Sequence, residues 1–270
     1  MRELRSDEIA LWRRRAGDGS RGVIVAGTLL ALWQVVSLWS ELPAFMLPAP
    51  SQVLSALAEE WRMLLPHAAT TALETALGLA AGVTAGVATA LAMAAALPLR
   101  RILLPVLVVT QALPVFAIAP LLVLWFGFGL ASKIVMAGLI IYFPVASTFY
   151  DALLRTEPGL LDLARLARAR RWQTLFLIRV PAALPALGSG LRISATLAPI
   201  GAVVGEWVGA AAGLGFVMIQ AQARVQTDIV FAALALLVAL ALLLRAAADQ
   251  LARRIAPWEP DNTQPLGDMA

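Results

Sequence analysis

Apolar residues in this chain form runs long enough to cross a bilayer, and short polar stretches separate these runs. A helix rises about 1.5 Å per residue, so crossing a hydrocarbon core of about 30 Å takes about 20 residues. Six runs meet or approach that length, over residues 22–39, 69–97, 102–126, 133–148, 186–208 and 229–248. We therefore predict an all-α integral membrane domain of six transmembrane helices over residues 22–256.

Two terminal segments and two loops complete the predicted organisation. Residues 1–21 are charged, and residues 257–270 are polar and contain proline, which predicts a disordered tail. The longest polar interruption is the loop 151–185 between the fourth and fifth runs. The stretch 209–228 is glycine-rich at its start and predicts a re-entrant or interfacial turn.

The loop 151–185 has the pattern of two short amphipathic helices. Leucines recur at three-residue spacing between Pro158 and Ala169, and a second apolar face runs from Trp172 to Val180, where Pro181 is expected to end it. Six arginines lie in this loop. Such a pair either lies on anionic lipid or forms a docking surface for another protein, and the pattern alone leaves both readings open.

Glycines and prolines inside the runs predict close packing and kinks. Gly78, Gly82 and Gly86 recur every four residues, so one bare helix face lets a neighbouring helix approach; a role in a substrate path is the alternative. Prolines within residues 102–126 free backbone carbonyls, which must be satisfied by protein or by a watery cavity. The resulting kink is therefore either structural or part of the pathway.

Composition and charge support the membrane assignment. The chain is 60% hydrophobic and 14% charged, which excludes an ordinary soluble domain. It has no cysteine and one histidine, His67, so a cysteine-based metal site is excluded and His67 is expected on a loop surface. The net charge of +4 does not indicate nucleic acid, because the arginines flank apolar runs.

The distribution of basic residues predicts the orientation of the chain. All but four of the 21 Lys and Arg residues lie in the two terminal segments, the 98–101 turn, the loop 151–185 and the end of the sixth run. Cytoplasmic segments of membrane proteins carry such an excess. We therefore expect both termini and the loop 151–185 in the cytoplasm.

Three charged residues fall inside predicted spans, where charges are costly and usually functional: Glu74, Arg192 and Glu206. The helical rise places the two glutamates at similar depths near the outer side and Arg192 nearer the inner side. A direct Glu74–Arg192 salt bridge is therefore not expected. We expect Arg192 either to snorkel toward the inner surface or to brace the loop 151–185 through a carboxylate such as Asp162 or Asp151.

Glu206, the adjacent Trp207 and Glu74 are the candidate residues of a substrate pathway. A carboxylate beside an aromatic ring could accept donors from an aminopyrimidine and stack its ring. The alternative places Trp207 in the interfacial aromatic belt and Glu206 against water.

The loop 151–185 contains a family motif. The segment Asp162-Leu163-Ala164-x3-Arg168-x9-Ile178-x-Val180-Pro181 resembles the EAA loop of ABC-importer permeases, with the pattern E-A-A-x3-G-x9-I-x-L-P. Ala164, Ile178 and Pro181 match, Asp162 is a conservative match, and Arg168 replaces the motif glycine. The resemblance implies that the loop, including Trp172, forms coupling helices that sit in a groove of a cytosolic ATPase subunit.

Three other stretches are similar to the nitrate/sulfonate/taurine-type branch of that family: residues 47–54, 111–129 and 205–228. The GEWVGA and GLGF segments within the last stretch most resemble permeases for hydroxymethylpyrimidine or related thiamine precursors. The resemblance implies a type I ABC-importer permease in the bacterial inner membrane. It also implies a periplasmic binding protein and a second permease copy as partners.

The chain has no catalytic or phosphate-binding pattern. It lacks the G-x4-G-K-[ST] sequence of a phosphate-binding loop, so ATP and Mg are expected on the partner ATPase and this chain is not expected to be an enzyme. Importers of aliphatic sulfonate, taurine or nitrate are the alternative within the family. An ion-coupled secondary transporter is a remote alternative, because intramembrane acids are few and no inverted repeat is visible.

Overall fold

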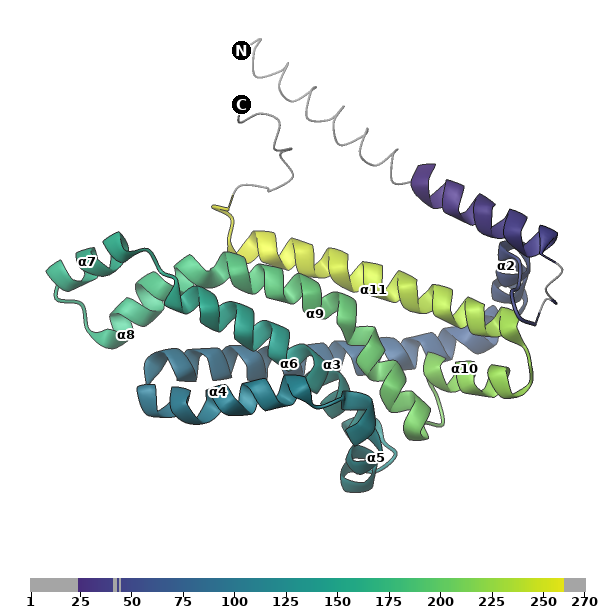
Figure 1. Ribbon diagram of the computed structural model, residues 1–270, viewed down its shortest axis with the longest axis horizontal. Coiled ribbons are helices and arrows are strands. Elements are labelled where there is room, and N and C mark those ends of the chain that lie inside the picture. Colours follow the sequence, from purple (N-terminus) through teal and green to yellow (C-terminus); the bar gives the residue numbers. More distant parts are fainter. Residues whose placement is uncertain (1–23, 41–42, 44, 260–270) are drawn as a thin grey trace, which may run out of the picture. The chain divides into compact units, whose positions relative to one another are not determined.

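The computed structural model describes residues 24–40, 43 and 45–259. The predicted segment 1–21 and residues 260–270 of the predicted tail lie outside this part. Within it every regular element is helical and no strand occurs, which confirms the all-α prediction (Figure 1). The helices follow in the order α2 (Pro50–Glu59), α3 (Trp61–Ala95), α4 (Leu97–Ala112), α5 (Val115–Phe126), α6 (Leu130–Leu154), α7 (Pro158–Leu166), α8 (Arg171–Gln173), η1 (Thr174–Arg179), α9 (Val180–Gly209), α10 (Leu214–Ala223) and α11 (Thr227–Ile255).

The chain forms two compact units, and the smaller one combines the described residues up to Arg62 with Gln220–Ala232. An apolar helix described over Ile24–Trp39 is tied to α2 through Gln34, whose side-chain oxygen accepts the Ser51 N–H at 3.2 Å. Trp33 packs on Phe231 with ring centroids 5.5 Å apart. These contacts join segments of this unit that are distant in sequence.

The larger unit, Met63–Ile219 with the chain from Ala233 onward, is built around the α6–α9 pair. Small and branched residues on both helices form its core, among them Ala137, Ile141, Val145, Ala195 and Ala198. Their short side chains let the two backbones approach closely, as is usual between helices in a bilayer.

Four helices are long and apolar enough to cross a membrane, or five if the bent pair α4–α5 counts as one span. The predicted first span is described only over Ile24–Trp39, which is shorter than these. The predicted number of six spans is therefore not reached by length and composition in the described chain, and it stays a prediction.

The predicted third span is not one continuous helix. It breaks between α4 and α5, whose axes differ by 105°. Leu113 and Pro114 at the break are both extended, with ψ of 122° and 108°. Proline has no N–H to donate and disfavours helical geometry in the residue before it, so the chain turns here.

The predicted helix end at Pro181 is wrong, because no break occurs there. The helix is continuous over Arg171–Gly209, 39 residues long, so the second loop helix and the fifth span are one element. Residues 174–179 form a π-helical segment in which the Val180 N–H donates to the Leu175 carbonyl. This wider turn precedes Pro181 and relieves the clash that a proline ring causes in a regular helix.

Candidate functional site

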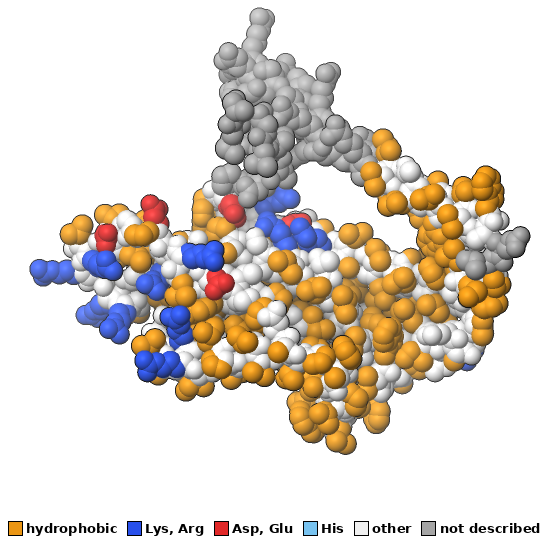
Figure 2. Space-filling view, in the orientation of Figure 1, with side chains coloured by type: hydrophobic (Ala, Val, Ile, Leu, Met, Phe, Trp, Pro, Cys, Tyr) orange, Lys and Arg blue, Asp and Glu red, His pale blue; other side chains and the backbone are white. Residues whose placement is uncertain are grey.

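The first part of the candidate site is the coupling loop, which we define as α7, α8, η1 and the turn 167–170. Helix α7 begins with Pro158 in its first turn and ends before Arg168. Blue Lys and Arg side chains gather over α7 and α8, whereas much of the rest of this face is orange (Figure 2). The coupling loop therefore forms a basic end on a largely apolar surface.

Arg168, which replaces the motif glycine, adopts the backbone conformation that a glycine would favour. Its φ is +52°, in the left-handed region. The Arg168 N–H donates to Arg165 O at 3.0 Å and the Ala169 N–H donates to Ala164 O at 2.9 Å. This pair of bonds is the Schellman ending of a helix, which normally has glycine at this position. The turn of the motif is therefore kept, with an arginine in a strained conformation.

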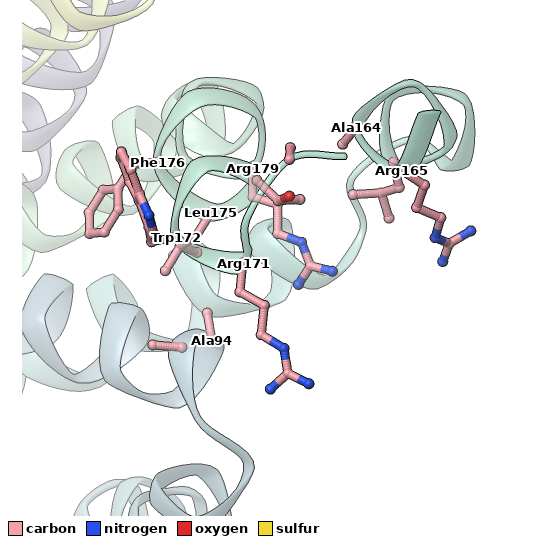
Figure 3. A pocket seen from close by; sticks show the side chains of 12 residues that line it. Ala94, Ala164, Arg165, Arg171, Trp172, Leu175, Phe176 and Arg179 are labelled. Carbon is pink, nitrogen blue, oxygen red and sulfur yellow. The ribbon is translucent and has the colours of Figure 1, made fainter. Parts of the chain in front are cut away.

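A cavity of about 550 Å³ lies between α7, the α8–η1 segment and the end of α3. Its walls are apolar at Ala94, Leu175 and Phe176, and basic at Arg171 and Arg179. Both guanidinium groups extend from the α8–η1 segment into open space, that of Arg179 toward α7 and that of Arg171 away from it (Figure 3). The Arg179 Nε atom is buried and has no hydrogen-bond acceptor among the residues that the structure describes. The cavity can therefore take an acidic or carbonyl-bearing group.

Of the predicted loop residues, Ala164 and Trp172 line this cavity. Asp162 is exposed and pairs with Arg165 at 2.6 Å on the same helix, and Ala164 is buried in the cavity wall. The Trp172 side chain lines the cavity and is 56% exposed. Ile178 and Pro181 are half-buried in η1 and the first turn of α9. Their role in docking stays a prediction.

The glycine stripe of α3 faces α6. A Cβ atom added at Gly82 would lie 2.7 Å from the Gly138 carbonyl oxygen, and one at Gly86 would lie 3.0 Å from the Val145 side chain. At Gly78 an added Cβ would overlap Ala137. These glycines let α3 and α6 pack with their backbones in contact, and they do not line a described cavity.

The second part of the candidate site is a buried polar cluster at one end of α3. Glu74 is 2% exposed, and its Oε1 lies 3.7 Å from the Nζ of Lys133 on α6. Lys133 also donates to the carbonyls of Phe128 at 2.9 Å and Gly129 at 3.2 Å, so it holds the α5–α6 turn. Glu206 of α9 lies beside the same part of α3, where the Thr71 hydroxyl, one turn before Glu74, donates to Glu206 Oε1 at 2.6 Å.

Glu206 belongs to a set of side chains that hold the turn between α9 and α10. The Gly215 N–H donates to Glu206 Oε2 at 2.5 Å, the Leu214 N–H to the Thr71 hydroxyl at 2.8 Å and the Gly213 N–H to His67 Nδ1 at 3.0 Å. Thr71 in turn donates to Glu206 Oε1 at 2.6 Å. Three successive amides at the start of α10 are thus satisfied, and the carboxylate lies at its positive end.

The GLG sequence is required by this arrangement. Gly213 has φ of +112°, which L-residues rarely adopt, and an added Cβ would overlap the Glu206 carboxyl group. A Cβ at Gly215 would lie 2.8 Å from Glu206 Oε2. The GEW and GLG segments therefore form one structural feature. Glu206 is 1% exposed and Trp207 is 50% exposed, and contact of either with a solute stays a prediction.

Arg192 does not reach the carboxylates that the sequence suggested. Its Nε lies 2.6 Å from Oδ1 of Asp249 on α11, whereas Asp162 pairs with Arg165. Asp249 also pairs with Arg245 one turn earlier, at 3.4 Å. The sequence reasoning considered only the nearby loop, and the packing of α9 against α11 supplies a closer partner.

Two other residues of the cluster differ from the sequence reasoning. His67 lies within α3 and bonds to Gly213, because the helix starts earlier than predicted; it is not a loop residue. Lys133, the first residue of the predicted fourth span, was not expected as a partner of Glu74, yet it is buried against it. The sequence did contain a signal for this pairing, because an acidic residue inside a span usually pairs with a cation on a neighbouring helix. Thr71, three residues before Glu74, shares its helix face.

Three comparisons with known proteins agree in the kind of protein. Residues 78–257 match the model of the family described as binding-protein-dependent transport system inner membrane component. A probable ABC transporter permease protein of Haemophilus influenzae is 48% identical over 232 residues, 86% of this chain and 95% of that protein. The riboflavin transport system permease protein RibX of Chloroflexus aurantiacus is 41% identical over 233 residues, 86% and 87% of the two chains.

A third relative covers less of the chain, and a solved structure supports the fold. The formylaminopyrimidine transport permease protein ThiX of Halalkalibacterium halodurans is 38% identical over 158 residues, 58% of this chain and 63% of that protein. The structure of the MetNI methionine ABC transporter in inward-facing conformations matches with a TM-score of 0.58 at 24% identity. It covers 72% of this chain and 94% of that chain, and at this identity it shows a shared fold alone.

Proposed function

This chain belongs to the binding-protein-dependent transport system inner membrane components and is an ABC importer permease subunit, and we propose that its solute is a hydroxymethylpyrimidine or related aminopyrimidine thiamine precursor. The observation that carries this proposal is the GEWVGA–GLGF segment, together with the 38% identity to a formylaminopyrimidine permease. The exposed ring of Trp207 within this segment offers a stacking surface for a planar heterocycle.

Riboflavin or a related flavin is the second candidate solute. The RibX relative is 41% identical and matches 86% of this chain, a longer match than that of the formylaminopyrimidine permease. Flavins and aminopyrimidines are both flat nitrogen heterocycles, so an aromatic stacking surface suits either. Taurine, aliphatic sulfonates and nitrate form the remaining group, and they offer an anion instead of a ring.

The coupling loop is the proposed docking surface for a cytosolic ATPase subunit. Its cavity combines the apolar walls at Leu175 and Phe176 with the guanidinium groups of Arg171 and Arg179. An ATPase groove with a carboxylate among apolar side chains would be complementary to it. ATP and Mg are bound by that partner in this proposal, and ATP hydrolysis takes place there.

The continuous helix Arg171–Gly209 is the proposed path of coupling. At about 1.5 Å per residue its 39 residues extend about 58 Å, from the cavity to the Glu206 cluster. A movement imposed on Trp172 by closure of the ATPase subunits would therefore displace the far end of the same element. The transport cycle follows from this switching between two arrangements, driven by nucleotide that binds one of them more tightly.

Two further partners complete the proposal. A periplasmic binding protein delivers the solute to the outer face, and a second copy of the permease encloses the pathway. In this arrangement the chain lies in the bacterial inner membrane with both termini in the cytoplasm, as the positions of its arginines indicate.

The substrate is tested by the ATPase activity of the assembled complex in proteoliposomes, with each solute presented on the binding protein. We expect stimulation by a hydroxymethyl- or formyl-aminopyrimidine and none by taurine, an alkanesulfonate or nitrate. Stimulation by riboflavin alone would replace the proposed solute with the second candidate. Stimulation only by a sulfonate or nitrate would rule out both heterocycles.

Docking is tested separately by copurification of the ATPase subunit. We expect Trp172→Ala to reduce the amount recovered, because this ring lines the cavity. Trp258→Ala is the matched control, since the two rings are 56% and 57% exposed and Trp258 lies outside the coupling loop. Equal recovery with both variants would contradict the docking surface.

A further inference from the structure

The buried cluster contains two carboxyl groups and one lysine. If all three groups are ionised, their charges do not cancel and one carboxylate oxygen has no hydrogen-bond donor among the described residues. Glu74 and Glu206 are 2% and 1% exposed, and the hydroxyl of Thr71, one turn before Glu74 on α3, donates to Glu206 Oε1 at 2.6 Å, so the two acids are neighbours. Lys133, 5% exposed, is the cation beside them. With every group ionised the cluster carries one net negative charge in a buried site, which is costly without compensation.

The Glu74 Oε2 atom shows where the imbalance lies. It is buried and accepts no hydrogen bond from any described residue. An ionised carboxylate can only accept, so two carboxylates side by side cannot bond to each other. A proton on one of them would supply both the missing hydrogen and the missing positive charge.

The surrounding donors indicate which acid carries this proton. Both oxygens of Glu206 already accept, one from the Thr71 hydroxyl at 2.6 Å and one from the Gly215 N–H at 2.5 Å, so Glu206 is held as the carboxylate. Lys133 lies 3.7 Å from Glu74 Oε1, beyond hydrogen-bond length, and donates to two backbone carbonyls instead. His67 Nδ1 accepts the Gly213 N–H at 3.0 Å, so this atom is not a donor to Glu74.

We propose that Glu74 is a proton-binding site that is occupied in the folded permease, where it donates a hydrogen bond to the neighbouring Glu206. The proton closes an acid brace, which we define as Glu74, Glu206 and Lys133. Lys133 holds the α5–α6 turn and Glu206 holds the α9–α10 turn, so the brace ties both turns to α3. This inference does not depend on which solute is carried.

Infrared spectroscopy of the purified full-length permease tests the proposal. A buried protonated carboxyl group gives a carbonyl stretching band distinct from that of a carboxylate, and the band shifts in D2O. We expect this band to be lost in Glu74→Gln, and to be retained in Asp249→Asn, where an ion-paired aspartate is removed instead. Loss of the band in Glu206→Gln but not in Glu74→Gln would overturn the assignment, as would its absence from the unmodified protein.

Hydrogen exchange of the α9–α10 turn provides a second measurement. Glutamine has the shape and charge of a protonated glutamate, so Glu74→Gln is expected to fold and to leave exchange at Gly213–Gly215 unchanged. Glu206→Gln removes the charged acceptor of the Gly215 N–H, and exchange there is expected to rise about tenfold or more. A Glu74→Gln protein that fails to fold, or that exchanges as fast as Glu206→Gln, would contradict the proposal.

Discussion

At the residue scale, two residues other than glycine among those the structure describes take up left-handed backbone conformations: Arg168 with φ of +52° and Val225 with φ of +60°. Each follows a helix end closed by the same two bonds, and in the second case Gln226 N–H donates to Ala221 O at 2.9 Å. Glycine would adopt this conformation without the clash that a side chain causes. The fold thus places strain at the ends of α7 and α10.

The strain at Arg168 predicts the effect of restoring the motif glycine. Arg168→Gly is expected to stabilise the end of α7 by about 1 kcal/mol, since the left-handed penalty outweighs the added flexibility of glycine. Amide exchange at residues 167–169 would slow about fivefold. Arg165→Gly is the control, and there exchange should accelerate, because that position is helical and carries the ion pair to Asp162. Faster exchange in both variants would contradict the interpretation.

Because the Glu206 carboxyl group lies against Gly213, we predict that alanine destabilises the protein more at Gly213 than at Gly127, another glycine with positive φ. Gly213→Ala is expected to lower the Tm more than Gly127→Ala, because both pay the backbone penalty of about 1–3 kcal/mol but only the first overlaps another side chain. No atom outside the adjoining residues lies within 4 Å of a Cβ added at Gly127. Thermal unfolding in detergent measures the difference in Tm. Equal Tm values would show that the Glu206 side chain can move away from the added methyl group at little cost in free energy.

At the element scale, the π-helical segment 174–179 sets the rotation of α8 relative to α9. One residue turns a helix by about 100°, so removing one residue from this segment would rotate α8 around the axis of α9. The cavity formed with α7 would then no longer have Arg171 and Arg179 on the same side.

Deletion of Leu177 tests this geometry, because its side chain is 67% exposed and little packing is lost. We expect the variant to fold, with binding-protein-stimulated ATPase activity reduced to the unstimulated level. The control is Leu177→Ala, which truncates the same side chain while keeping the residue count and is expected to retain stimulation. A deletion variant that keeps full stimulation would show that the rotation of α8 does not matter.

At the scale of the whole molecule, the absence of cysteine makes the proposed orientation directly measurable. Single cysteines at Leu54 of α2 and Leu166 of α7 would both be accessible, since these side chains are 66% and 82% exposed. With a membrane-impermeant maleimide on intact cells we expect labelling at Leu54→Cys and, only after permeabilisation, at Leu166→Cys. The unmodified protein is the blank. Labelling of Leu166→Cys in intact cells would reverse the orientation.

Prolines break a helix at one position of this fold and lie inside a continuous helix at others. The local sequence pattern alone therefore does not predict where a helix ends. Pro114 separates α4 from α5, whereas Pro181 and Pro185 lie inside the continuous helix Arg171–Gly209. Whether a missing N–H breaks a helix depends on what else satisfies the backbone, and here a π-helical turn precedes the tolerated prolines. Sequence alone shows the missing donor and not this compensation.

The sequence by itself determined the helical class, most of the membrane-crossing segments and the coupling loop, because these depend on apolar run length and on spacing along one chain. It also identified Glu74, Glu206 and Arg192 as charges inside predicted spans. Only the tertiary structure decided those partners, Lys133, the GLG amides and Asp249. Partner choice depends on the rotation and crossing of helices distant in sequence, which the side-chain pattern of a single helix does not specify.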